Sequence, residues 1–436
     1  MQPPVPPYFC TAMLDRRTPP PIHPIVVPPI PAADVRPLTG GSRLHVLRQG
    51  GQPIVALEIY LPTPGHGVRP LPLNMAVAML QEGTRNRSAA ELQEALALKG
   101  AFVSLGADEE HAHIGIYTLA RYVPDVLILL REMLTEASFE DEPFALQKAQ
   151  ALQSFRIGRE KTTVLASEAF NARIFGPDSF LGAVPTEAEI EGTTALAASE
   201  LYYNHLATQR AEVFLAGQFE PELADIVAEG LAPILGQRHN EHALLGSAVA
   251  YQEGERLELP KPGSRQVSLR LGRRLFGREH KDYFAMRVLT EVFGGYFGSR
   301  LMKNVREEKG LTYGISARLR PVQGTGAFVV GTDVNQENYQ LAVQEIFAEM
   351  RRLQEEPIGA EELETVRSYM LGNFAASLGT VLQAMDRHKV IVLSGLPADY
   401  HHQYLDAIRH ITPDQLQACA QTYLRPEDML TVAAGV

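Results

Sequence analysis

The order of segments in this chain is written twice, and an internal repeat limits the possible folds more than any single motif does. The first copy opens with the alternating stretch 55–61, typical of a half-buried strand, and the second opens with 267–271. A helical pattern follows at 72–82 in one copy and at 283–293 in the other, and each ends at glycine, a common helix stop signal. Two related domains are therefore expected.

The later segments of the two copies also correspond. Each copy continues with a helix, two strands, two further helices and a closing apolar strand. These segments are expected at 89–100, 101–106, 113–119, 123–136, 144–159 and 213–217 in the first copy, and at 299–310, 311–317, 326–334, 336–353, 360–373 and 430–435 in the second. The pattern predicts an α+β fold of two homologous domains, each a mostly antiparallel sheet packed with helices.

Domain boundaries follow from the repeat and from composition. A chain of 436 residues is long enough for two large domains, expected at 38–235 and 262–436. The stretch 236–261 has mixed charge and no clear period, so it is predicted to be the linker. Residues 1–37 are proline-rich, and such a segment should be an extended arm without a core of its own. This arm is either a solvated tail or a segment that lies along a partner subunit.

Charge and cysteine content exclude several classes of protein. The chain has 40 Lys and Arg against 51 Asp and Glu, a formal net charge of −11, which argues against nucleic acid or an anionic membrane as the main partner. Cys10 and Cys419 form no Cys-x-x-Cys pair, so neither a disulfide framework nor a cysteine-ligated zinc site is expected. No apolar run is long enough to span a membrane, and the first residues lack the pattern of a signal peptide. A cytoplasmic location is expected.

Two segments resemble a known family. The stretch 74–84 reads Asn-Met-Ala-Val-Ala-Met-Leu-Gln-Glu-Gly-Thr and leads to a Gly-Ala pair at 100–101. The stretch 299–313 reads Ser-Arg-Leu-Met-Lys-Asn-Val-Arg-Glu-Glu-Lys-Gly-Leu-Thr-Tyr. Both are similar to segments of the M16 zinc peptidases, the pitrilysin-like family that includes mitochondrial processing peptidase and short bacterial members. The resemblance covers nearly all of 38–436 and implies two domains arranged as a clamshell around a peptide-binding chamber.

The zinc motif of that family is degenerate in this chain. Active members carry His-x-x-Glu-His, and those three chemical positions correspond to Asn74, Val77 and Ala78. A zinc peptidase needs about three protein ligands with lone pairs, and valine and alanine offer none. Val77 also replaces the general base, and the region 150–155, where the family places a distal Glu ligand, has no carboxylate. We therefore expect no metal in this chain.

A second pair of family residues is retained. By resemblance, Arg306 and Tyr313 would hold the substrate backbone opposite the zinc, because a guanidinium and a phenol donate well to a peptide carbonyl or a developing oxyanion. Without the family, Arg306 would be expected to pair with a surface acid such as Glu307 or Glu308, and Tyr313 to lie in the core.

The resemblance leads to one main functional hypothesis and two alternatives. The chain is expected to be a non-catalytic, substrate-binding subunit of a heterodimeric M16 zinc metallopeptidase, whose partner carries His-x-x-Glu-His and the zinc and cleaves peptides. A homodimer is also possible. The first alternative is a peptide-binding or scaffold protein with no role in proteolysis. The second is an autonomous metal enzyme that uses other histidines.

Those other histidines are expected to have ordinary roles. The group 239–242 should be a solvated loop, the pair His111 and His113 should line a groove or face solvent, and His401, His402 and His410 should lie at the surface. The glycine-rich stretch 294–298 lacks the Gly-Lys-Ser/Thr signature of a phosphate-binding loop and is expected to be only a turn before the next helix.

Overall fold

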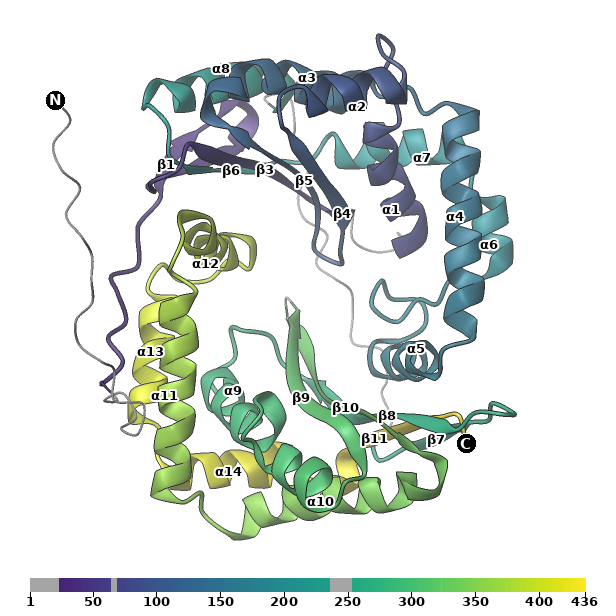
Figure 1. Ribbon diagram of the computed structural model, residues 1–436, viewed down its shortest axis with the longest axis vertical. Coiled ribbons are helices and arrows are strands. Elements are labelled where there is room, and N and C mark those ends of the chain that lie inside the picture. Colours follow the sequence, from purple (N-terminus) through teal and green to yellow (C-terminus); the bar gives the residue numbers. More distant parts are fainter. Residues whose placement is uncertain (1–22, 64–68, 236–252, 323) are drawn as a thin grey trace, which may run out of the picture.

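The computed structural model describes residues 23–63, 69–235, 253–322 and 324–436. Two sheets face each other across the interior, and helices cover their outer faces (Figure 1). This arrangement confirms the predicted α+β fold with two domains closed like a clamshell. We call the part up to residue 235 the N-terminal half and the part from residue 253 the C-terminal half.

The N-terminal half contains a six-stranded sheet in the order β1-β2-β6-β3-β5-β4. All neighbouring strands are antiparallel except β2 and β6, which run parallel. The strands are β1 (Asp34–Pro37), β2 (Arg43–Arg48), β3 (Ile54–Pro62), β4 (Phe102–Ala107), β5 (His111–Leu119) and β6 (Glu212–Gly217). The helices are α1 (Pro70–Ala78), α2 (Ala89–Ala97), α3 (Val123–Glu136), α4 (Asp141–Arg159), α5 (Thr162–Phe175), α6 (Glu187–Gly192), α7 (Ala195–Leu201) and α8 (Glu222–Leu235), with short turns η1 (Thr39–Gly41), η2 (Met79–Gln81), η3 (Ala120–Tyr122) and η4 (Tyr202–Leu206).

The C-terminal half repeats this topology. Its five strands follow the order β7-β11-β8-β10-β9, and only β7 and β11 run parallel. The strands are β7 (Arg256–Leu259), β8 (Gln266–Leu275), β9 (Thr312–Val322), β10 (Thr325–Asn335) and β11 (Leu430–Ala434). The helices are α9 (Tyr283–Thr290), α10 (Tyr339–Glu355), α11 (Ala360–Ala376), α12 (Val381–Leu393), α13 (Tyr400–His410) and α14 (Pro413–Tyr423), with short segments η5 (Glu291–Gly295), η6 (Met302–Glu308), η7 (Gln336–Asn338) and η8 (Pro426–Asp428).

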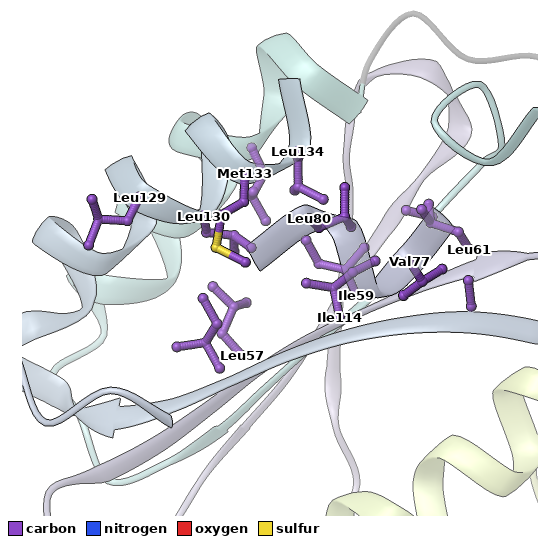
Figure 2. Packing of buried hydrophobic residues seen from close by; sticks show 14 of the residues in the cluster. Leu57, Ile59, Leu61, Val77, Leu80, Ile114, Leu129, Leu130, Met133 and Leu134 are labelled. Carbon is purple, nitrogen blue, oxygen red and sulfur yellow. The ribbon is translucent and has the colours of Figure 1, made fainter. Parts of the chain in front are cut away.

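Alternation along each strand sorts side chains between the outer and inner faces of the sheet, because successive residues point to opposite sides. On β3, Leu57, Ile59 and Leu61 are buried under α1 and α3, as Figure 2 shows. Between them, Glu58 and Tyr60 point to the inner face, toward the other half of the molecule. The outer face therefore holds the apolar core, and the inner face carries the polar groups.

Two segments lie at the predicted domain boundaries. Strand β1 occupies the last four residues of the predicted arm and pairs with β2, and β7 lies inside the predicted linker and pairs with β11. The described residues 23–33 form no helix or strand, and Ile25 lies against α11 at Gly372, so this part of the arm contacts the chain's own C-terminal half. The boundaries at 37, 235 and 261, and a contact of the arm with a partner subunit, remain predictions.

The two halves are joined by an exchange of helices. Helix α5, from the N-terminal half, packs on the inner face of β8 and β11 in the C-terminal half. Helix α12, from the C-terminal half, packs on β2 and β6 in the N-terminal half, where Ala384 and Met385 meet Leu47, Phe214 and Ala216. Full burial of a large apolar side chain contributes on the order of 1.5–3 kcal/mol, so each exchanged helix anchors one half to the other.

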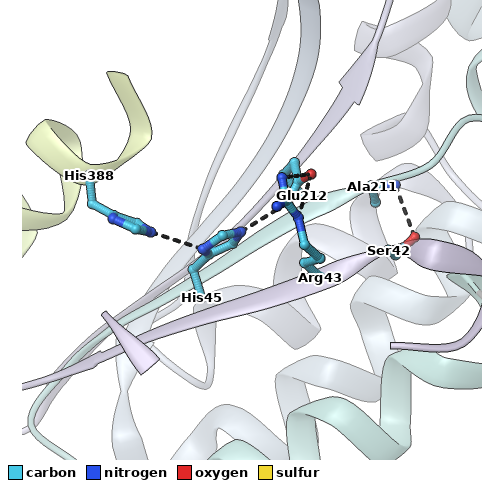
Figure 3. Close-up of polar contacts among 6 residues, drawn as sticks. All are labelled: Ser42, Arg43, His45, Ala211, Glu212 and His388. Atoms are coloured by element: carbon cyan, nitrogen blue, oxygen red, sulfur yellow. Dashed lines mark hydrogen bonds and ion pairs between the residues drawn. The ribbon is translucent and has the colours of Figure 1, made fainter. Parts of the chain in front are cut away.

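A polar network borders the α12 contact (Figure 3). His388 Nε2 lies 2.9 Å from His45 Nδ1, and His45 Nε2 lies 2.9 Å from Glu212 Oε2. Burial, reinforced by the nearby His45, lowers the pKa of His388 to about 4, so this ring is neutral at neutral pH. Burial opposes ionisation of Glu212, but hydrogen bonds from His45 and Arg43 hold its pKa below the usual value.

A buried ion pair lies beside this network. Lys389 of α12 donates to Glu58 of β3, and the two residues are only 7% and 6% exposed. Lys389 also contacts Asp386, whose side chain is 65% exposed. Burial disfavours the charged amine, but the attraction of Glu58 outweighs it and raises the pKa of Lys389. The pair links the two halves by charge at a site from which water is largely excluded.

We predict that Lys389→Met destabilises the protein by about 3–5 kcal/mol, because it leaves the Glu58 carboxylate buried without its cation. Asp386→Asn is the matched control and should change the free energy of unfolding by less than about 1 kcal/mol, since that partner is exposed. Urea unfolding followed by circular dichroism measures both. Equal effects of the two variants would show that the buried pair does not join the halves.

Candidate functional site

Asn74, the first of the three positions predicted to correspond to the zinc motif, is part of the local structure of α1. Its side chain is exposed, and Nδ2 donates to Pro70 O at 2.9 Å, four residues earlier in the helix. Its Oδ1 accepts from the backbone N–H of Ala107, at the end of β4, at 3.2 Å. The amide of Asn74 therefore joins α1 to an edge strand.

The other two positions offer no ligand atoms. Val77 is fully buried on the core side of α1, and Figure 2 shows it beside Leu61. Ala78 is half-buried. The region 150–155, where a distal ligand is expected, lies on α4 and has no carboxylate. Within residues 23–63, 69–235, 253–322 and 324–436, no cluster of three or more His, Cys, Asp or Glu side chains could hold a metal ion. The residues present do not fit a catalytic zinc.

The remaining histidines do not assemble a site in the described part of the chain. His111 and His113 share the inner face of β5 beside Tyr60, with ring centroids 6.2 and 5.9 Å from it. His401 was expected at the surface, and that prediction is wrong: it is 3% exposed, and its Nε2 lies 2.7 Å from Arg387 O. His402 and His410 are exposed, as expected. The group 239–242 lies outside the described residues.

Arg306 and Tyr313 lie close together at the junction of η6 and β9. The η6 segment is a π-helical stretch, a distortion often found at functional sites. It ends at Glu308, and the turn that follows contains Gly310, whose φ of 62° suits glycine. The Arg306 guanidinium carbon lies 5.5 Å from the Tyr313 ring centroid and 4.8 Å from that of Phe297, within cation–π range. The two aromatic rings hold the guanidinium in place.

Both side chains line one hollow of about 500 Å³. Tyr313 is 93% exposed, so it is not a core residue, and Arg306 is half-buried with no ion-pair partner among the residues that the structure describes. The expectation based on residue type alone, a surface ion pair and a core tyrosine, is therefore wrong. Whether the two side chains bind substrate remains a prediction.

The glycine-rich stretch contributes more to this hollow than a simple turn. Phe297 and its neighbour Tyr296 line the hollow, and sequence analysis missed both. Gly294 is required for packing, because a Cβ there would lie 2.7 Å from the Cβ of Ala317 on β9. This close approach brings the stretch beside β9. The one feature of the sequence that could have indicated Tyr296 and Phe297 as lining residues is their position directly after a pair of glycines.

A second hollow of about 260 Å³ continues along the inner face of the sheet and shares Gly314, Ser316 and Gly331 with the first. Arg270 of β8 and Arg318 of β9 line it. Burial, together with the charge of Arg318, lowers the pKa of Arg270. Neither arginine has an ion-pair partner among the described residues. The two hollows form one open path with guanidinium donors at both ends.

No helix in the described part of the chain is both long and apolar enough to cross a membrane.

Comparisons with known proteins agree with this architecture. Residues 194–370 match the family model described as Peptidase M16 inactive domain. The chain is 23% identical to the protein named Uncharacterized zinc protease YmxG of Bacillus subtilis, over 71% of this chain and 75% of that protein. It is 21% identical to the Non-peptidase homolog YmxG of Helicobacter pylori, over 80% of this chain and 81% of that protein.

A solved structure matches over nearly the whole chain. It is the crystal structure of a peptidase M16 inactive domain from Pseudomonas fluorescens, with a TM-score of 0.81 at 21% sequence identity, covering 92% of this chain and 98% of that one. The shared fold agrees with the family match. Residues 194–370 thus match the inactive domain of the M16 peptidases, and the chain as a whole shares the fold of the solved M16 inactive-domain structure from Pseudomonas fluorescens.

Proposed function

We propose that this chain is the non-catalytic, substrate-binding subunit of a zinc metallopeptidase assembled from two M16 chains. One observation carries the proposal: Arg306 and Tyr313 lie together in an open hollow, while the three positions on α1 that correspond to the zinc motif do not form a set of metal ligands. A chain that has such donors and lacks the metal ligands can take part in zinc-dependent hydrolysis only beside a chain that supplies those ligands.

The chemistry of the hollow suits an extended peptide. The Arg306 guanidinium and the Tyr313 hydroxyl are donors, and a peptide backbone presents carbonyl acceptors. Arg306 is free of carboxylate partners in the described structure, so binding a carbonyl would not require breaking an ion pair. The adjoining hollow adds Arg270 and Arg318 along the same path, which gives room for further residues of the peptide.

In this proposal the partner supplies His-x-x-Glu-His, a distal Glu and the zinc, and the bond is cleaved there. Arg306 and Tyr313 would then hold the substrate carbonyl and stabilise the developing oxyanion in trans. One YmxG relative is named a zinc protease and the other a non-peptidase homolog. These names agree with a family that contains both catalytic and non-catalytic chains. A homodimer would bind peptide without cleaving it. A cytoplasmic location remains a prediction.

A peptide-binding or scaffold protein with no role in proteolysis is the second candidate. The observation that favours it is that the former zinc positions have become structural, since Asn74 joins α1 to β4 and Val77 packs in the core. The open Arg306 and Tyr313 hollow weighs against a pure scaffold, because packing alone does not need a tyrosine that is 93% exposed.

We predict that the purified chain alone hydrolyses no peptide, and that activity appears when it is mixed with a zinc-motif-bearing M16 protein from the same source. Arg306→Ala should lower the activity of the mixture about 100-fold or more, because it removes a transition-state donor. The matched control is Lys303→Ala, which removes an exposed cation from the same segment and should leave the rate unchanged. Zinc-dependent hydrolysis by the chain alone, or equal rates for both variants, would contradict the proposal.

A second prediction separates the Tyr313 hydroxyl from its ring. Tyr313→Phe keeps the aromatic face that holds Arg306 and removes only the donor, so the kcat of the mixture should fall while KM changes little. Tyr369→Phe removes the hydroxyl of another tyrosine at the same hollow. It serves as the control and should leave kcat unchanged. A rise in KM with unchanged kcat would mean that Tyr313 contributes to peptide binding alone.

A further inference from the structure

A separate hollow of about 340 Å³ lies in the C-terminal half, among α9, α11, α12, α13 and β9. It shares no lining residue with the Arg306 and Tyr313 hollow. Three arginines from different parts of the chain line it: Arg278 from the loop after β8, Arg287 from α9 and Arg387 from α12. Nothing in the proposed peptidase role uses these arginines.

The positive charge of this hollow is not balanced by its own residues. Among the described residues, Glu291 is the one carboxylate that lines it, and it pairs with Arg287 at 3.3 Å. Arg387 donates to Ser377 Oγ at 2.7 Å and lies over the ring of Phe374, and burial lowers its pKa. Neither Arg387 nor Arg278 has an ion-pair partner among the described residues. Two guanidiniums therefore line a partly enclosed space without a carboxylate partner, so an anion that enters it would not have to displace one.

Neutral donors complete the lining. Tyr283, Tyr400 and Tyr404 all border the hollow, and the first two are 8% and 7% exposed. Burial raises the pKa of Tyr400 and of Tyr404, so their hydroxyls stay protonated and can donate. Burial lowers the pKa of His401, which keeps this ring neutral at neutral pH. The excess of positive charge thus comes from the arginines alone.

We propose that this hollow binds a small organic molecule that carries a dianionic oxyanion group, a phosphate monoester or a pair of carboxylates. Planar guanidinium forks suit both groups, since each can accept paired hydrogen bonds. The hollow is larger than an inorganic anion requires, and Phe374, Met370 and Leu319 give it an apolar side for the organic part.

Arg387 connects the hollow to the contact between the two halves. The next two residues of α12, His388 and Lys389, make the contacts to His45 and Glu58 in the N-terminal half. A ligand held by Arg387 therefore rests on the helix that joins the halves. Because the ligand binds the folded state, it raises the unfolding temperature with concentration.

The experiment is isothermal titration calorimetry on the full chain alone, with thermal unfolding as a second readout. The probes are phenyl phosphate, inorganic phosphate, phthalate and the uncharged benzyl alcohol. Phenyl phosphate or phthalate should bind saturably and raise the unfolding temperature, and benzyl alcohol should do neither. Stronger binding of phenyl phosphate assigns the site to phosphate monoesters, and stronger binding of phthalate assigns it to dicarboxylates.

Arg278→Gln is the main variant, because this loop residue has no ion pair to lose in the described structure. It should weaken binding at least about 10-fold, the usual effect of removing a charged hydrogen-bond donor. Arg351→Gln, which changes an exposed arginine on α10 outside this hollow, is the matched control and should bind as the parent does. Arg387→Lys keeps a positive charge but not the fork and should be intermediate. Failure of every anion to bind at millimolar concentration, or equal weakening by Arg278→Gln and Arg351→Gln, would overturn the proposal.

Discussion

The exchange of α5 and α12 between the two halves is the contact on which the rest of the structure depends. Each helix covers the inner face of the opposite sheet, so each half completes a core that the other begins. The ion pair between Lys389 and Glu58 and the hydrogen bond between His388 and His45 lie beside one of these contacts. Apolar burial supplies the attraction, and the polar pairs fix how α12 lies on the sheet.

This arrangement also shows how the positions predicted to correspond to the zinc motif take part in the fold without a metal. The outer faces of the sheets hold the cores, and on α1 Val77 has joined that core while Asn74 bonds to the end of β4. Arg306 and Tyr313 lie in the other half, on segments whose packing does not involve α1. The predicted substrate donors and the predicted metal position are therefore structurally independent, as the proposed division of labour between two subunits requires.

Much of the fold could be predicted from the sequence, because the repeat shows the same succession of helices and strands twice and the alternation at 55–61 marks a half-buried strand. The helix exchange could not, since periodicity identifies an apolar face without saying which sheet covers it. His401 was predicted at the surface because its partner, the carbonyl of Arg387, lies on another helix and cannot be identified from local sequence. Arg278, Arg287 and Arg387 likewise meet only through tertiary packing.

The most direct test of the central claim is site-specific photo-crosslinking. A benzophenone amino acid replaces Tyr313, and the chain is mixed with a labelled peptide and a zinc-motif-bearing M16 partner whose general base is changed from Glu to Gln, so that peptide binds without being cleaved. The control probe replaces Ile128, which is 61% exposed on α3. The account predicts labelling of peptide from position 313, strengthened by the partner, and none from position 128. Equal labelling from both positions would contradict it.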